Sequence, residues 1–404
     1  MNKKISAGSI HQGNKKLILK LIKRKGEISR SAIANKTGLT PPTVRRIIDE
    51  LIDDYKLIEY KGLGSSNGGR PPLIVKFKSA NNYIIGIDLG ATYIRGCLVD
   101  LDARFMSEIQ IPTEIEKGFN HIIEKVVQII KKFQDRPENG SKIWGVGIGV
   151  AGLVNRDTGI IEYSPDFGWK NINLQEEISK MIQLPVFYDN STRLMALGEL
   201  NFNKKSRVKN FAIINVGYGI AAGLVIDGNL IKGHSGFAGE FGHITVDTCS
   251  KVKCKCGKYG CLEALASGHR IASLGKNALD KENAEILKKL SEGNVNLVSA
   301  ELVGKAAQQG DELSIEIYDN ITEYLAQGIG NLANLLNPEV VYIGGGISLN
   351  GKFFFDLINK KISNYLLSPN QGLKILPSTF TDQATSIGAV SLVLEKIMNL
   401  ELNN

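Results

Sequence analysis

The sequence predicts an α/β protein with a small, separate helical part at its N-terminus. Charge is divided unevenly, because residues 1–78 hold 17 Lys and Arg against 6 Asp and Glu (net +11), while the rest of the 404-residue chain holds 32 against 35 (net −3). Apolar residues recur at helical spacing in the basic part, and four apolar runs end in glycine turns in the remainder. A chain of this length accommodates two or three domains with full cores.

Three helices are predicted in the basic part. The first covers residues 14–25, the second begins at the N-cap Ser29 and stops at Gly38, and the third follows Thr40, a capping residue, with Pro41 at its first position. Their helical spacing predicts these inward-facing residues: Leu17, Ile18, Leu21, Ile22, Ile33, Ala34, Val44, Ile47, Ile48 and Leu51. This leaves Thr43, Arg45 and Arg46 on the outer face of the third helix. The arrangement is that of a helix-turn-helix, whose third helix enters a major groove.

Two short strand-like runs, residues 57–60 and 73–77, follow the helices and flank a Gly- and Pro-rich loop. Two strands and a loop form a wing, and Arg70 on that loop suits a narrow A·T minor groove. The loop could instead be a flexible linker, and the whole basic part could be a three-helix protein-interaction domain. Its net charge favours double-stranded DNA as the partner.

The larger part has the pattern of an α/β domain. Its four apolar strands end in glycine turns, and helical stretches are expected between them at residues 118–133, 171–182 and 313–336. The strand-turn segments are residues 84–92, 144–152, 213–219 and 340–346. Any one of these glycine turns could simply reverse the chain direction, but four of them together indicate a ligand cleft at the strand ends.

Three of the five cysteines are crowded into eight residues, at Cys254, Cys256 and Cys261, and His243 precedes them. One imidazole and three thiolates close a tetrahedral site with no open position, which predicts a structural Zn²⁺. The alternative is a set of buried cysteines beside a hydrogen-bonded histidine. No apolar run reaches the roughly 18 residues needed to span a bilayer, and no signal-type segment is evident, so a cytoplasmic location is expected.

The segments 214–223, 239–243 and 260–263 together resemble the signature of the ROK family (repressors, open reading frames, kinases). The resemblance covers essentially the whole chain, because one branch of that family joins a winged helix-turn-helix to a sugar-kinase-like body. It implies an actin-like, ribonuclease-H-type fold with two lobes, zinc in the cysteine loop, and sugar between the lobes. The implied domains are 1–78 (winged helix-turn-helix), 79–200 (first lobe) and 201–404 (second lobe, its last helix returning to the first). The implied sugar contacts are Asn190, Glu240, His243 and Glu263.

The residues that a kinase of this family needs are partly missing. Ser191 stands where the family has the Asp that takes the proton from the sugar hydroxyl, and a serine hydroxyl is no base near pH 7. Asp189 could substitute if the turn were reorganised. Tyr218 replaces a Thr between glycines that receive ATP phosphates, and Ala221-Ala222 stand where a Gly normally lies. Asp88 and Thr92 are retained.

We therefore expect a sugar-responsive repressor of carbohydrate-utilisation genes that is not an enzyme. Its effector is a sugar or sugar phosphate, and it acts as a homodimer or homotetramer because two DNA half-sites mirror protein symmetry. Two alternatives remain, an ATP-dependent sugar kinase that also binds DNA, and a DNA-binding zinc sensor without a sugar ligand. The sequence does not identify the sugar or the operator.

Overall fold

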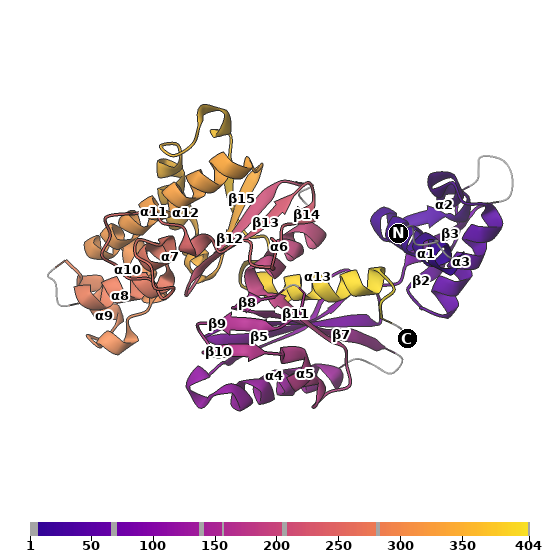
Figure 1. The fold of residues 1–404 in the computed structure, drawn as a ribbon, viewed down its shortest axis with the longest axis horizontal. Coiled ribbons are helices and arrows are strands. Elements are labelled where there is room, and N and C mark those ends of the chain that lie inside the picture. Colours follow the sequence, from indigo (N-terminus) through magenta and orange to yellow (C-terminus); the bar gives the residue numbers. More distant parts are fainter. Residues whose placement is uncertain are drawn as a thin grey trace.

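The computed structural model describes residues 7–65, 71–136, 141–155, 157–203, 208–279 and 283–402. The fold is mixed α/β, with a small N-terminal head and two lobes that are each built on a five-stranded sheet (Figure 1). In these described residues, no helix is long and apolar enough to cross a membrane.

The head is a winged helix-turn-helix. Its helices are α1 (Ala7–Lys25), α2 (Arg30–Thr37) and α3 (Pro41–Asp53), and its antiparallel sheet has the order β1 (Glu27–Ser29), β3 (Leu73–Phe77), β2 (Ile58–Leu63). Ser29 caps α2 by accepting from the Ala32 amide at 3.1 Å, and Gly38 ends α2 in the left-handed region with φ of 71°. These two caps are as predicted, whereas β1 was not predicted.

Two predictions for the head are wrong in detail, and one cannot be tested. Leu17 is 48% exposed, because the buried face of α1 is formed by its neighbours Ile18, Leu19 and Ile22. Thr40 occupies the N-cap position of α3 but makes no capping hydrogen bond, since its Oγ1 pairs with Thr43 Oγ1 at 2.9 Å. Arg70 lies outside the described residues.

The first lobe carries a mixed sheet in the order β11-β7-β4-β5-β6, in which β4, β7 and β11 run parallel. Helices α4 and α5 pack on one face of this sheet (Figure 1). The predicted helix over residues 171–182 is wrong at its start, where a small antiparallel sheet ends, and the helix there covers only Leu174–Ser179. The elements are β4 (Asn82–Leu89), β5 (Tyr93–Asp100), β6 (Phe105–Pro112), α4 (Phe119–Gln134), β7 (Lys142–Val150), β8 (Leu153–Val154), β9 (Ile161–Ser164), β10 (Trp169–Ile172), α5 (Leu174–Ser179) and β11 (Val186–Asn190).

The second lobe carries a sheet in the order β14-β13-β12-β15-β16 and a larger set of helices whose apolar faces share one core. Its strands are β12 (Phe211–Val216), β13 (Ile220–Ile226), β14 (Asn229–Leu230), β15 (Val340–Gly344) and β16 (Lys374–Pro377). Its helices are α7 (Leu262–Ala266), α8 (Gly268–Ala278), α9 (Glu285–Leu290), α10 (Ala300–Gln308), α11 (Glu312–Leu336) and α12 (Gly351–Ile362). Short 3-10 turns in the two lobes are Ile115–Lys117, Phe241–His243, Val295–Leu297, Gly346–Asn350, Ser368–Asn370 and Thr381–Gln383.

Two helices cross between the lobes, α6 (Ser191–Phe202) and α13 (Ala384–Met398), as Figure 1 shows. The two helices can approach this closely because a Cβ on Gly388 would collide with the carbonyl of Leu194 in α6. Gly147 of β7 likewise lets α13 pack on the sheet, since a Cβ there would collide with the carbonyl of Ala389. Apolar residues of α13 from Ile387 to Met398 belong to the same buried cluster as the core of the head. In addition, Lys23 of α1 donates to the Leu101 carbonyl at 2.6 Å. The head is therefore packed against the body rather than tethered by a bare linker.

Candidate functional site

The four residues predicted to bind metal come together in the second lobe. The ligand atoms of His243, Cys254, Cys256 and Cys261 all lie within 4.8 Å of one another. His243 Nδ1 is 3.6 Å from Cys254 Sγ, and the sulfurs of Cys256 and Cys261 are 3.7 Å apart. Two zinc–sulfur bonds of about 2.3 Å at a tetrahedral angle separate their sulfurs by about 3.8 Å. The donor set and its spacing therefore fit a structural zinc.

Local backbone structure brings these ligands together. His243 ends a 3-10 turn, and Cys261 immediately precedes α7. A tight turn follows Cys254, whose carbonyl accepts from the Gly257 amide at 3.0 Å, with Gly257 at a φ of 92°. Gly260 has a φ of 68°, and a Cβ there would collide with the Asp247 carbonyl. These glycines let the loop fold back so that Cys254 and Cys261 face the same point.

Two of the predicted sugar contacts flank the segment from His243 to Cys261 that carries the cysteine and histidine cluster, called the metal loop below. Glu263 in α7 accepts from the Ile220 amide at 3.0 Å, and Gly219 lacks the side chain that would collide with this carboxylate. Glu240 lies 3.9 Å from Nε2 of His243. Burial raises the pKa of the Glu240 carboxyl, against the opposing influence of His243 and Arg193. The imidazole of His243 thus has Nδ1 towards the cysteines and Nε2 towards Glu240.

Asn190, the fourth predicted sugar contact, lies in the first lobe at the end of β11. Its Oδ1 caps α6 by accepting from the amides of Thr192 and Arg193 at 3.0 and 3.1 Å. Its Nδ2 donates to the Gly152 carbonyl at 3.0 Å, which leaves one amide hydrogen for a ligand. Asn190 therefore has a structural task in the turn besides any contact with sugar.

Arg193, a buried arginine that the sequence analysis did not single out, connects the end of β11 with a loop of the second lobe. Arg193 is 4% exposed and donates through Nε to Asp189 Oδ1 at 3.0 Å, while Nη2 also donates to Asp189. Nη1 donates to the Gly236 carbonyl in the loop that leads to Glu240. Asp189 also accepts from the Asn190 amide at 2.7 Å. The signal was an Arg at the start of an otherwise apolar helix, where only a buried acid could balance it.

Ser191, at the position of the kinase base, is the first residue of α6 and is buried. Asp189, the alternative base, is two residues away and is held by Arg193. Reorganising this turn to present Asp189 to a ligand would leave a buried guanidinium unpaired, which is strongly unfavourable.

Side chains from both lobes line a cavity between the glycine turns that follow β4 and β12. Lys255 of the metal loop lies 4.4 Å above the Tyr218 ring and 3.5 Å from Asp166 of the first lobe. With Thr92 they line a cavity of about 250 Å³, whose other residues are Ala91, Ile115 and Pro165. Nearby, burial raises the pKa of Asp88 to about 6, although Arg95 at 3.7 Å opposes the shift.

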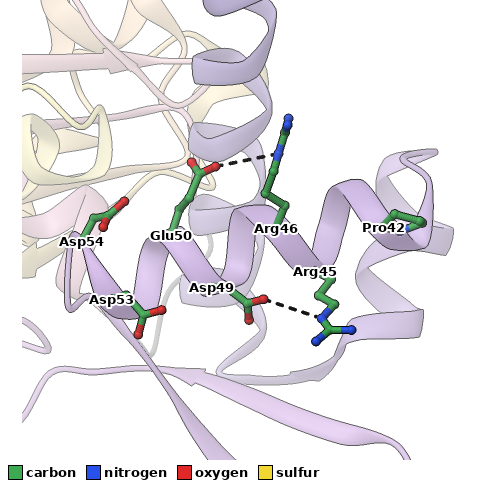
Figure 2. A pocket seen from close by; sticks show the side chains of 7 residues that line it. All are labelled: Pro42, Arg45, Arg46, Asp49, Glu50, Asp53 and Asp54. Carbon is green, nitrogen blue, oxygen red and sulfur yellow. Dashed lines mark ion pairs between the residues drawn. The ribbon is translucent and has the colours of Figure 1, made fainter.

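Three of the four predicted DNA contacts lie on α3, while Arg70 is outside the described residues. Arg45 and Arg46 have side chains that are 74% and 66% exposed, and Thr43 is partly exposed one turn towards the N-terminus. Each arginine forms an ion pair with the acid four residues later in α3, as Figure 2 shows. Arg45 Nε lies 3.7 Å from Asp49 Oδ2, and Arg46 Nε lies 3.8 Å from Glu50 Oε1. These acids were not part of the predicted site.

Comparison with known proteins gives consistent results for both parts of the chain. A model described as the ROK family matches residues 84–396, and one described as winged helix-turn-helix DNA-binding matches residues 13–54. The xylose repressor of Caldicellulosiruptor bescii is 32% identical over 392 residues, which are 96% of this chain and 97% of that protein.

Two solved structures are similar as well. The crystal structure of a ROK family transcriptional regulator, a homologue of the E. coli MLC protein, is 30% identical with a TM-score of 0.81, covering 97% of this chain and 98% of its own. A ROK family glucokinase from Streptomyces griseus, solved with glucose and AMPPNP, is 28% identical with a TM-score of 0.70, covering 77% of this chain and 98% of its own.

Proposed function

Since this chain belongs to the ROK family and carries a winged helix-turn-helix at its N-terminus, we propose that it is a transcriptional repressor controlled by a sugar. The head (residues 1–78) binds an operator next to carbohydrate-utilisation genes. The effector, a sugar or sugar phosphate, binds between the lobes (residues 79–200 and 201–404) to Asn190, Glu240, His243 and Glu263. The likeness to a xylose repressor along nearly the whole chain supports this proposal.

The chemistry at the start of α6 is the observation that carries the proposal. A sugar kinase needs a base for the attacking hydroxyl, and its loss typically costs on the order of 10² to 10⁴ in rate. Ser191 carries no carboxylate that could act as the base, and the carboxylate of Asp189 is paired with Arg193. The body therefore binds a sugar and responds to it instead of phosphorylating it.

A structural zinc held by His243, Cys254, Cys256 and Cys261 crosslinks the loop whose two ends carry Glu240 and Glu263. His243 directs Nε2 towards Glu240, while Cys261 immediately precedes the helix that carries Glu263. The loop thus orients both carboxylates towards sugar hydroxyls, as outer-shell residues orient ligands in other metal sites. The effector shifts the arrangement of the lobes only by the difference in its affinity for the two states.

Operator binding measured with a panel of sugars tests this function. The purified protein, in a homodimeric or homotetrameric state determined by light scattering, is titrated with promoter DNA in the presence of xylose, glucose, an amino sugar or a sugar phosphate. One class of sugar is expected to weaken operator binding at least tenfold. If sugars have no effect while reversible zinc removal controls binding, the chain is a zinc sensor instead.

The kinase alternative has one observation in its favour, because the chain retains Asp88 near the end of β4 and Thr92 in the turn that follows. Coupled ADP-release assays with the same sugars separate the two functions. Sugar-dependent turnover by the wild-type protein would contradict the repressor proposal in its non-enzymatic form.

Restoring the missing carboxylate by Ser191→Asp is expected to leave sugar-dependent ADP release at background. The reason is that Tyr218 still stands where kinases of the family have the phosphate-binding Thr, and its ring, covered by Lys255, narrows the cavity beside Thr92. The double variant S191D/Y218T tests this reason, since a rise of about tenfold or more over S191D alone would assign the remaining block to Tyr218. Turnover by S191D alone would show that the cavity is open to nucleotide.

A further inference from the structure

The outer face of α3 carries two matched pairs of charged residues, which Figure 2 shows side by side. Arg45 Nε lies 3.7 Å from Asp49 Oδ2, and Arg46 Nε lies 3.8 Å from Glu50 Oε1. Pairs of this spacing are common on exposed helices and add little stability. Two negative charges beside the proposed DNA-reading residues also repel phosphates, which lowers affinity for DNA in general.

Both acids are held in place by residues from other elements of the head. Glu50 is 26% exposed and accepts from His11 Nε2 of α1 at 2.9 and 3.0 Å, with Lys15 Nζ at 3.2 Å. Burial raises the pKa of the Glu50 carboxyl, but the hydrogen bonds from His11 and Lys15 outweigh it and lower that pKa. A carboxylate with this many fixed donors stays charged and does not move with the arginine.

Asp49 is fixed in the same way from the other side of α3. Its Oδ1 accepts from Arg30 Nη2 of α2 at 3.0 Å and from the Tyr60 hydroxyl of β2 at 3.0 Å. The guanidinium of Arg30 also lies 5.0 Å from the centre of the Tyr60 ring. Asp49 thus ties the start of the wing to the helix that bears Arg45.

Arg46 is held from two directions. His11 donates through Nε2 to the acceptor-only carboxylate of Glu50, so its Nδ1 in that tautomer accepts from Arg46 Nη2 at 3.2 Å. Glu50 faces Nε of the same guanidinium. With Nε facing Glu50 and one N–H of Nη2 used by His11, the donors left for a base are Nη1 and the second N–H of Nη2, and one N–H from each of these nitrogens forms the fork that pairs with O6 and N7 of guanine.

We propose that Asp49 and Glu50 are positioning residues that orient Arg45 and Arg46 for guanine in the major groove of the operator. This inference rests on the proposed function, because it needs a sequence-specific DNA site. An arginine held in place loses less rotamer freedom on pairing with a base and is less able to swing to a phosphate. The acids thereby lower affinity for DNA in general and raise discrimination between sequences.

The test compares Glu50→Gln and Asp49→Asn with Asp53→Asn in the full-length protein. Asp53 lies one turn further along the same helix, is exposed, and is drawn in Figure 2 without an ion pair. A duplex is first selected from a random library by the wild-type protein. The affinities for that duplex, for versions with each G·C pair changed to A·T, and for a scrambled duplex are then measured at one salt concentration.

Loss of a positioning acid is expected to reduce the ratio of selected to scrambled affinity about three- to tenfold, and to flatten the preference at guanine positions. D53N removes the same charge and is expected to raise both affinities equally, so that the ratio is unchanged. Equal rises in E50Q and D49N as well would overturn the inference. If one variant fails to fold by circular dichroism, the other decides. A wild-type protein that selects no sequence would refute the proposed function itself, which is a different result.

Discussion

Replacement of Cys261 by Ala is expected to abolish zinc binding and the response to sugar, while operator binding survives. The residue is fully buried, is one of four ligands of a closed set, and immediately precedes the helix that bears Glu263. Structural zinc sites contribute folding free energy directly, so a fall in Tm on the order of 10 °C is expected for the body. Metal analysis, calorimetry and operator titration with and without the effector measure the three effects.

Cys249→Ala is the matched control for this experiment. Cys249 is an exposed free cysteine outside the metal cluster, so its loss should leave zinc content, Tm and sugar response unchanged. Full zinc content in C261A would contradict the metal assignment. Loss of zinc with an unchanged sugar response would instead separate the metal loop from the effector site.

Replacement of Arg46 by Ala is expected to weaken operator binding about 5- to 150-fold, which corresponds to roughly 1–3 kcal/mol for a bidentate base contact. The base preference at one operator position should be lost at the same time. The Arg46 side chain is 66% exposed, and its guanidinium contacts Glu50 and His11. Fluorescence anisotropy with the selected duplex and its single-pair variants measures both effects.

Lys36→Ala provides the comparison, because Lys36 is an exposed cation on α2 and not on α3. Removal of a cation that only attracts phosphates weakens binding uniformly across sequences and lowers the salt dependence. If R46A behaves like K36A, with equal loss on selected and scrambled DNA, then Arg46 contacts phosphates and not a base.

Much of the head follows from apolar spacing. The buried face of α3 is the predicted one, because four apolar residues at helical spacing leave a 13-residue helix only one face to bury. Leu17 was misplaced because α1 has adjacent apolar residues on either side of its stripe, and only the packed neighbours decide which side is inward. The start of the predicted helix at residue 171 is wrong because Asn171 has a φ of 54°, outside the helical region, and Asn173 caps α5 by accepting from the Glu176 amide at 3.2 Å.

The candidate site divides in the same way. The four residues of the candidate zinc cluster could be found from the sequence because their donor chemistry is distinctive and three of them lie close together. The partners of Asp189 and Glu50 could not be found from the sequence. Several acids could have paired with Arg193, and His11 lies 39 residues before the carboxylate that it binds. Lys255 likewise gave no signal of its contact with Asp166 in the other lobe.

The sequence by itself determined the helix-turn-helix, the α/β body, the cysteine and histidine ligands, and the serine in place of the kinase base. Each of these depends on residue type and local spacing, which are properties of the chain before it folds. Only the tertiary structure decided that Asp189 is paired with Arg193, that Tyr218 and Lys255 share the cavity beside Thr92, and that Asp49 and Glu50 are anchored behind the arginines. These are contacts between charged or aromatic side chains from separate elements. The sequence is compatible with many alternative partners for each of these side chains, and only the packing of the folded chain selects one.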